Sequence, residues 1–327
     1  MKYFTNKKIL LILFSLLFVV ASTTAQTSNS TDINSEEIKL PVLNNHRFVV
    51  NQYTSSPFIK TYFRNTLGGG AALDLKVPIL IIDGEPLAGL RGDLTFLTLE
   101  FEYQYAVNNW LAVFGNVGMV SRFGTEAQAL LAQGINATYG FELGWMFKLL
   151  ETEKVVLSAT ANLWNQSGTV LTFYDFVQDI IDNGGLEPDN QLIYSKDYIQ
   201  GGGGLRVAWA PSELIGVNGL SEFLFGESLD NTGTKIFYNI AGSIDLDLNK
   251  VWSVPIGFAF GATVNTFLSS NDSSVDENTT SVFLRTSYTG RNDILISLDM
   301  TWNKMPISQP KQTLNGSTAN ISVEYYF

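Results

Sequence analysis

The chain has 327 residues, of which 45% are hydrophobic, and its 31 acidic residues outnumber its 20 basic ones. The resulting net charge of −11 excludes a nucleic-acid-binding role, since such a role needs a basic patch. The chain has no Cys, which excludes disulfides, thiolate metal sites and a lipid anchor on cysteine.

The first 25 residues have the three parts of a secretory signal peptide. Three lysines give a positive start, an apolar run follows over 9–21, and residues 22–25 supply small side chains for cleavage. Cleavage is expected after Ala25, with Ala21 as the rival position. We therefore predict a signal peptide over 1–25 and export across the inner membrane.

Residues 26–66 do not alternate regularly. They begin with a polar stretch and continue into a stretch with several Phe and Tyr residues, which also contains His46, the only histidine of the chain. Two interpretations are open for this segment. It is either a periplasmic extension or a partial plug inside the structure formed by the residues that follow.

Residues 67–327 alternate between apolar and polar side chains with the period of a β-strand, most clearly over 251–267. Beyond the signal peptide, no apolar run approaches the length of about 18 residues that a membrane-spanning helix needs. Strands of soluble proteins usually run about five or six residues, whereas tilted membrane strands need about 9–11. The pattern predicts twelve strands, near residues 70–82, 94–107, 110–121, 135–149, 154–165, 199–210, 218–228, 235–248, 251–267, 280–290, 292–303 and 317–327.

The connections between these strands alternate in length. Short ones fall near 108–109, 151–153, 211–218, 249–250 and 290–291, and long ones at 83–93, 122–134, 166–198, 229–234, 268–279 and 304–316. Bacterial outer-membrane barrels have short periplasmic turns and longer extracellular loops. The sequence therefore predicts an all-β fold: a transmembrane antiparallel β-barrel of about twelve strands over 67–327, with periplasmic termini and long extracellular loops.

Four consecutive glycines interrupt the strand predicted near 199–210. They are Gly201 to Gly204, and glycine inside a strand marks a bulge, a bend or a close approach of backbones. We favour extra curvature of the wall at this place. A plug element resting against these glycines is the alternative.

Two of the long loops carry helical patterns. Residues 125–128 match a capping box, and apolar residues recur at helical spacing in the longest loop. We expect short helices in these loops, either packed over the barrel mouth or forming an apolar lid. The lid candidates are Phe173, Tyr174, Val177, Ile180 and Ile181.

The polar face of the predicted strands carries charged residues, mostly acidic. Charges on the lipid face are disfavoured, so these side chains are expected to line the lumen. They form either a network of ion pairs that rigidifies the barrel or a weakly cation-preferring conduit. The lumen-lining candidates are Glu100, Glu102, Glu142, Lys148, Arg206, Asp245, Asp247, Arg285, Asp299 and Glu324.

The last residues alternate strictly and end on an aromatic: Ile321, Val323, Tyr325 and Phe327 share one face. In this respect the chain resembles Gram-negative outer-membrane β-barrel proteins, and its signal peptide and Asn- and Lys-rich composition are similar to those of Bacteroidota. The segment 57–64 is similar to one that precedes the first strand in a large group of uncharacterised transporter barrels. No functional residue is carried over from that group.

An enzyme is not expected. Outer-membrane hydrolases of the phospholipase and omptin types use a histidine on the barrel wall, whereas His46 lies outside every predicted strand. No nucleophile elbow, phosphate loop or metal-ligand cluster occurs, and no cofactor or metal is expected. We expect an outer-membrane barrel for passive transport of small solutes, apolar ones included, through a narrow, partly occluded acidic lumen. The alternative is a non-conducting structural barrel, or one that docks an envelope protein partner. In either case the barrel contacts outer-membrane lipid.

Overall fold

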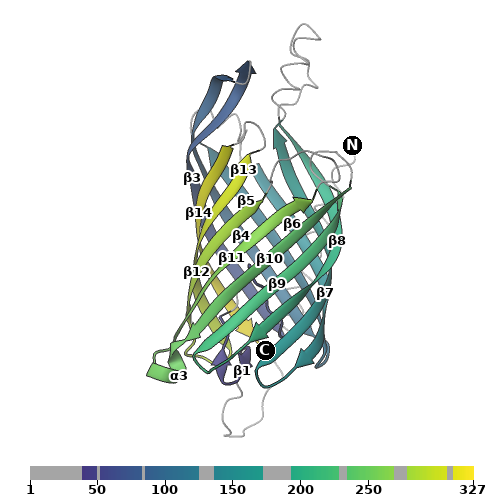
Figure 1. Ribbon diagram of the computed structural model, residues 1–327, viewed down its shortest axis with the longest axis vertical. Coiled ribbons are helices and arrows are strands. Elements are labelled where there is room, and N and C mark those ends of the chain that lie inside the picture. The colour runs from purple at the N-terminus through teal and green to yellow at the C-terminus, as the bar shows by residue number, and fades with distance from the viewer. Residues whose placement is uncertain are drawn as a thin grey trace. The chain divides into compact units, whose positions relative to one another are not determined.

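The computed structural model describes residues 39–49, 52–82, 85–124, 136–171, 193–227, 234–268, 278–307 and 312–327. In these parts of the chain, twelve antiparallel strands close into a barrel (Figure 1). The strand number and the antiparallel arrangement predicted from the sequence are confirmed. The barrel strands are β3 (Tyr62–Ile82), β4 (Glu85–Ala106), β5 (Leu111–Gly124), β6 (Asn136–Glu151), β7 (Val155–Leu171), β8 (Ile193–Trp209), β9 (Ile215–Glu227), β10 (Thr234–Asp247), β11 (Ile256–Leu268), β12 (Thr279–Tyr288), β13 (Ile294–Ile307) and β14 (Gln312–Tyr326).

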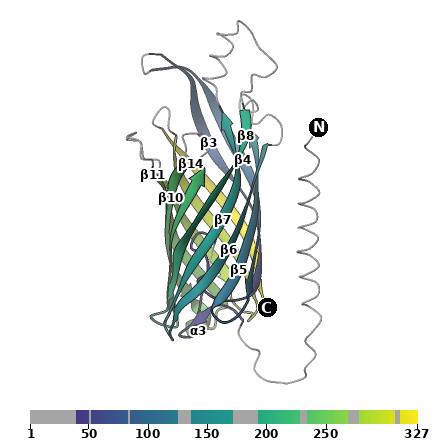
Figure 2. The ribbon, with the colours of Figure 1, turned by 90° about the vertical axis from the view of Figure 1, so that its right-hand side faces the viewer.

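Each strand pairs with its neighbours in the chain, and the last strand pairs with the first. β14 and β3 close the barrel through a ladder that runs from Ser317 opposite Ala71 to Tyr326 opposite Tyr62. Figure 2 shows β5, β6 and β7 running tilted along the barrel, with α3 (Leu248–Trp252) at one end. The five short connections between strands lie at this end, which we call the short-turn end. Among the described residues, no helix has the length and apolarity that crossing a membrane would require.

The first hairpin is longer than the sequence analysis expected. β3 begins at Tyr62, before the expected start of the barrel at residue 67, and β4 begins at Glu85. The expectation of a long loop over 83–93 is therefore wrong. The β3–β4 ladder includes Pro86, Gly89 and Gly92 and contains register shifts, one of them between Pro78 and Leu80.

The strand expected over 251–267 begins later, at Ile256. Asp247 ends β10 and caps the single turn of α3, since its carboxylate accepts a hydrogen bond from the Asn249 backbone N–H at 3.0 Å. Ser253 then takes the left-handed conformation that often ends a helix, with φ of 54°. The alternation of Trp252 and Val254 with their neighbours therefore reflects a turn and not a strand.

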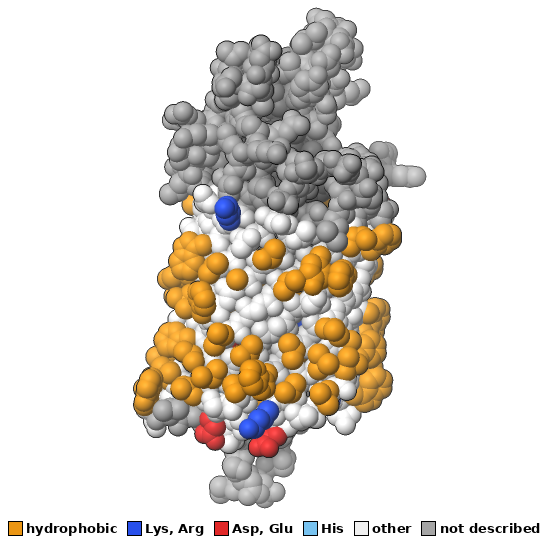
Figure 3. Space-filling model, in the orientation of Figure 1, with side chains coloured by type: hydrophobic (Ala, Val, Ile, Leu, Met, Phe, Trp, Pro, Cys, Tyr) orange, Lys and Arg blue, Asp and Glu red, His pale blue; other side chains and the backbone are white. Residues whose placement is uncertain are grey.

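The two faces of the barrel wall differ in chemistry. On β14, Ile321 and Tyr325 are exposed on the outside, whereas Ser322 and Glu324 are buried inside. The visible outer surface in Figure 3 carries many apolar side chains among uncharged atoms, and the prominent charged side chains lie near the two ends of the coloured part. A closed barrel that is apolar outside and polar inside has the pattern of a transmembrane barrel.

Placing a charge on the outer face tests this assignment. Ile240 lies halfway along β10 with its side chain exposed. We expect Ile240→Arg to lower the free energy of unfolding in phospholipid vesicles by about 2–4 kcal/mol, the cost of an arginine at the lipid midplane. Urea titration measures this, with Ile240→Val as the matched control. An unchanged stability would mean that acyl chains do not surround β10.

Candidate functional site: the lumen and its inner segment

The described residues 39–49 and 52–61 run inside the short-turn end of the barrel, and we call them the inner segment. Residues 50 and 51 lie outside the described part. In the inner segment, β1 (Val42–Leu43) and β2 (His46–Arg47) form a short hairpin. Figure 1 labels β1 near α3. Phe48 and Val49 are fully buried, although no strand of the barrel contains them. The inner segment is thus enclosed by the wall.

Hydrogen bonds join the inner segment to inward-facing groups on several sides of the wall. They involve β4, β7, β8, β10 and the connection between β12 and β13. The bonds run from Gln104 Nε2 to the Phe58 and Lys60 carbonyls (2.8 Å each), Ser158 Oγ to the Pro57 carbonyl (2.6 Å), Arg206 Nη1 to the Ser56 carbonyl (3.4 Å), the Val49 N–H to Asp245 (3.1 Å), the Arg47 N–H to Asp247 (3.4 Å) and Arg47 Nη1 to the Thr289 carbonyl (2.5 Å).

Glycines on the wall make room for the apolar part of the inner segment. The Phe48 ring lies 4.6 Å from the His46 ring and 5.3 Å from the Phe58 ring. A Cβ on Gly216 would lie 2.6 Å from Phe48, and one on Gly257 would lie 2.9 Å from Cγ2 of Val49. Because real Cβ atoms do not come this close without displacing a neighbour, a larger residue at Gly216 would push the segment aside.

His46 is held as a neutral imidazole at this interface. Its Nδ1 lies 3.1 Å from the Glu213 carbonyl, so Nδ1 carries the proton, and its Nε2 is buried without a partner among the described residues. Burial lowers the pKa of His46 below its ordinary value of 6.5, although the Glu213 carbonyl and Asp247 oppose the shift. Protonation would place a charged, unpartnered N–H against Gly216.

Five charged side chains alternate in sign across the inner wall, and we call them the ion-pair belt. In the order of their pairing, which differs from the order of the strands, they are Glu102 on β4, Arg64 on β3, Glu324 on β14, Arg285 on β12 and Asp299 on β13. Arg64 pairs with Glu102 and lies 3.7 Å from Glu324, and Arg285 lies 2.9 Å from Glu324 and 3.6 Å from Asp299. Arg285 and Glu324 are each 1% exposed, so the belt is sealed from solvent.

The other candidates from the sequence lie elsewhere. Asp245 and Asp247 bind the inner segment, and Arg206 lies over the Phe114 ring at 4.9 Å. Lys148 pairs with Glu151 at the short-turn end. Glu100 and Glu142 face a separate chamber, and the lid candidates in 173–181 lie outside the described residues.

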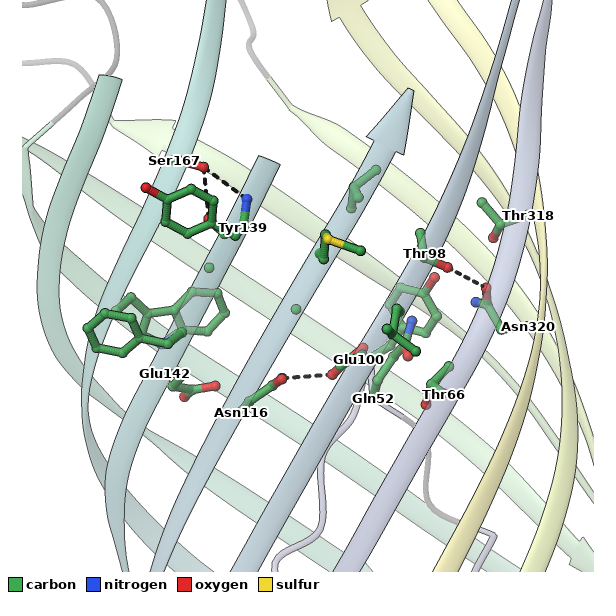
Figure 4. Close-up of a pocket in the computed structure, with 18 residues that line it drawn as sticks. Gln52, Thr66, Thr98, Glu100, Asn116, Tyr139, Glu142, Ser167, Thr318 and Asn320 are labelled. Carbon is green, nitrogen blue, oxygen red and sulfur yellow. Dashed lines mark hydrogen bonds between the residues drawn. The ribbon is translucent and has the colours of Figure 1, made fainter. Parts of the chain in front are cut away.

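The chamber has a volume of about 390 Å³ and lies beyond the inner segment, away from the short turns. Gln52 and Tyr53 line it from the inner segment, and the wall contributes residues of β3 to β7 and β14. Glu100, Asn116 and Glu142 lie in a row on three adjacent strands (Figure 4), and Asn116 donates to Glu100 at 2.7 Å. No group of three or more His, Asp or Glu suited to a metal ion occurs among the described residues.

The four glycines of β8 allow a contact between strands that are not neighbours. Asn162 on β7 donates to Glu142 at 2.8 Å and also to Glu222 on β9 at 2.7 Å. Gly202 is the ladder partner of Asn162, and a Cβ there would lie 1.9 Å from the Phe223 carbonyl oxygen. If each of the four glycines carried a Cβ atom, the atom nearest to that Cβ would belong to β7 or β9. Close approach of backbones therefore accounts for the glycines, and a resting plug does not.

Sequence reasoning missed several residues of the lumen. Arg64 was overlooked because it precedes the expected start of the barrel. Asn116, Asn162 and Trp164 were overlooked because they carry no charge, although they stand at inward positions of the alternation. Their spacing from Glu100 and Glu142 becomes visible only once the strands are in register.

Removing a charge from the ion-pair belt should destabilise the barrel strongly. We expect Arg285→Met to lower the free energy of unfolding by about 3–5 kcal/mol, because Asp299 loses its buried positive partner and Glu324 keeps only the more distant Arg64. Arg291→Met removes an arginine from an exposed pair with Asp293, and we expect that change to cost less than about 1 kcal/mol. Urea titration in lipid vesicles compares the two variants. Equal costs would contradict the buried network.

The imidazole of His46 can be titrated directly, since it is the only one in the chain. In tag-free protein, its ring NMR signal should titrate with a midpoint below 6.5. The unfolded chain then binds this proton more tightly than the folded protein does. The neutral His46 therefore contributes fully to the free energy of unfolding above pH 6.5. This contribution is lost as the pH falls below 6.5, because the unfolded chain then takes up the proton first. A midpoint at or above 6.5 would contradict the buried neutral ring.

No protein-family model matches the chain, and no curated protein matches it. Among solved structures, the NanC porin has a TM-score of 0.47 at 8% identity, covering 81% of this chain and 100% of that one. The toluene transporter TodX of P. putida has a TM-score of 0.41 at 11% identity, covering 82% and 90%. The translocator domain of the autotransporter NalP from Neisseria meningitidis has a TM-score of 0.45 at 10% identity, covering 82% and 88%. At this distance, function has to be inferred from the chain's own residues.

Proposed function

We propose that this protein is an outer-membrane channel for the passive transport of small polar solutes. The observation that carries the proposal is the chamber of about 390 Å³, lined by both polar and apolar residues inside a barrel with an apolar exterior. A volume of this size suits a small molecule. The short turns and the inner segment face the periplasm, as short turns do in outer-membrane barrels.

The polar groups among the residues that line the chamber favour a polar solute over an apolar one. Thr66, Thr98, Glu100, Asn116 and Asn320 all line the chamber. An apolar solute would have to strip water from these groups without offering them hydrogen bonds, which is costly. The apolar lid candidates that suggested such a solute lie outside the described residues and give it no further support.

The inner segment acts as a gate that closes the channel at its periplasmic end. Hydrogen bonds to β4, β7, β8 and β10 and apolar contacts with the wall hold it in place, and none of these is covalent. Passage of a solute then requires the segment to move away from part of the wall. The many contacts make the closed state the resting one.

A non-conducting barrel is the second candidate, and the same contacts favour it. Arg47, Val49, Pro57 and Phe58 touch different sides of the wall, so the inner segment could be a permanent filling. In that case the barrel would serve as a structural element or as a docking surface for an envelope protein. The two candidates differ in whether the segment moves.

A disulfide between the inner segment and the wall separates the two candidates. Cβ atoms in disulfides lie about 3.5–4.5 Å apart, and Gly257 lies close enough to Val49 for Val49→Cys/Gly257→Cys to form one. Since the chain has no other Cys, no competing disulfide can form. We expect the oxidised variant to lose conductance in planar bilayers and the reduced variant to regain it.

The matched control is Val49→Ala/Gly257→Ala, which adds a Cβ atom at Gly257 without a cross-link. Its conductance should be the same under oxidising and reducing conditions. Equal conductance of the oxidised and reduced cysteine variants would contradict gating by the inner segment. Absence of conductance in the wild-type protein under all conditions would favour the non-conducting barrel.

A further inference from the structure

Two carboxylates of the chamber have no ion pair within the described part of the chain. Glu100 on β4 accepts a hydrogen bond from the Asn116 amide, and Glu142 on β6 accepts one from the Asn162 amide. These donors are neutral. The acids of the ion-pair belt differ in this respect, since each of them lies within ion-pair distance of an arginine. No ion pair of the described residues therefore neutralises either carboxylate, although Arg64 acts electrostatically on Glu100 and Arg206 on Glu142.

The chamber also has unused hydrogen-bond acceptors. Thr66 stands opposite Glu100 in the β3–β4 ladder and lines the chamber, as Figure 4 shows. Its side chain is only 3% exposed, and its Oγ1 has no partner among the described residues. Asn116 Oδ1 is likewise unpartnered there, because only its amide nitrogen is used. Buried acceptors of this kind are normally satisfied by protein or by ordered water, and a ligand with donors would satisfy them as well.

An aromatic ring borders the same site. Trp164 on β7 lines the chamber and is the ladder partner of Glu142. An indole ring attracts a cation placed over its face. The indole N–H is buried without a partner among the described residues, and a cation, which has no acceptor, would leave it so.

We infer that the chamber binds a small organic cation with an ammonium or guanidinium head group. Such a head group offers several N–H donors and no acceptor, and it matches the charge of Glu100 and Glu142. Hydrogen bonds between a cation and a carboxylate are among the strongest in proteins. An anion would be repelled by both carboxylates, and a neutral solute would leave their charge uncompensated. The inference names the solute class of the proposed channel and rests on that proposal for its biological meaning.

Binding to the full-length protein in detergent tests this inference without requiring conduction. Methylguanidinium is the probe, methylurea is its neutral analogue, and acetate is the anionic comparison, each followed by calorimetric titration at pH 8. We expect methylguanidinium to bind and the other two to show no saturable binding. Glu100→Gln and Glu142→Gln should each weaken binding by about tenfold or more, the worth of one charged hydrogen bond.

Glu153→Gln is the matched control, because it removes the same charge from an exposed turn and should leave binding unchanged. Equal binding of methylurea and methylguanidinium, or glutamine variants that bind as the wild type does, would overturn the inference. If the variants do not fold, the three probes on the wild-type protein still decide between the outcomes. If the protein binds methylguanidinium but shows no flux, the proposed channel function is contradicted, whereas the proposed cation-binding site is still supported.

Discussion

The whole arrangement depends on satisfying the polar groups that face the interior of the barrel. Burying such a group without a partner costs free energy. In a barrel of about eight strands, side chains alone just fill the interior, but twelve strands enclose more space than side chains can fill. Two features of this protein supply partners for the inward-facing groups. Charged side chains pair with one another along the ion-pair belt, and the inner segment lies inside the short-turn end. Both features give ion-pair or hydrogen-bond partners to inward-facing groups that would otherwise lack them.

These features are not spread evenly along the lumen. At the short-turn end, Asp245 receives hydrogen bonds from the Val49 N–H, Asn218 and Ser243, so its acceptors are well used. In the chamber, Glu100 and Glu142 each accept one amide hydrogen bond. The inner segment therefore supplies a donor to a carboxylate at the short-turn end, whereas each of the two chamber carboxylates accepts only one amide hydrogen bond. A solute site belongs in the chamber, because a ligand can supply there the further donors that these carboxylates lack.

The sequence predicts those features that depend on one strand at a time. The period-two alternation sufficed for the strand number, the inward face of β14 and the apolar exterior, because each strand shows it alone. It failed at α3, where the capping of a turn by Asp247 overrides the alternation of Trp252 with its neighbours. It also could not find the contact of Asn162 with Glu222, because that contact passes over the glycines of a third strand. Register and the path of the inner segment are non-local, so no periodicity encodes them.

Amide hydrogen exchange of the inner segment in the folded, lipid-embedded protein tests the central claim most directly. The N–H groups of Asn44, Phe48 and Val49 donate to the Glu153 carbonyl, the Pro41 carbonyl and the Asp245 carboxylate. If the wall and the segment satisfy each other, these three amides exchange far more slowly than those of an unstructured peptide, though faster than the strand amides of the barrel. Exchange at the unstructured rate, with the strands still protected, would contradict the account.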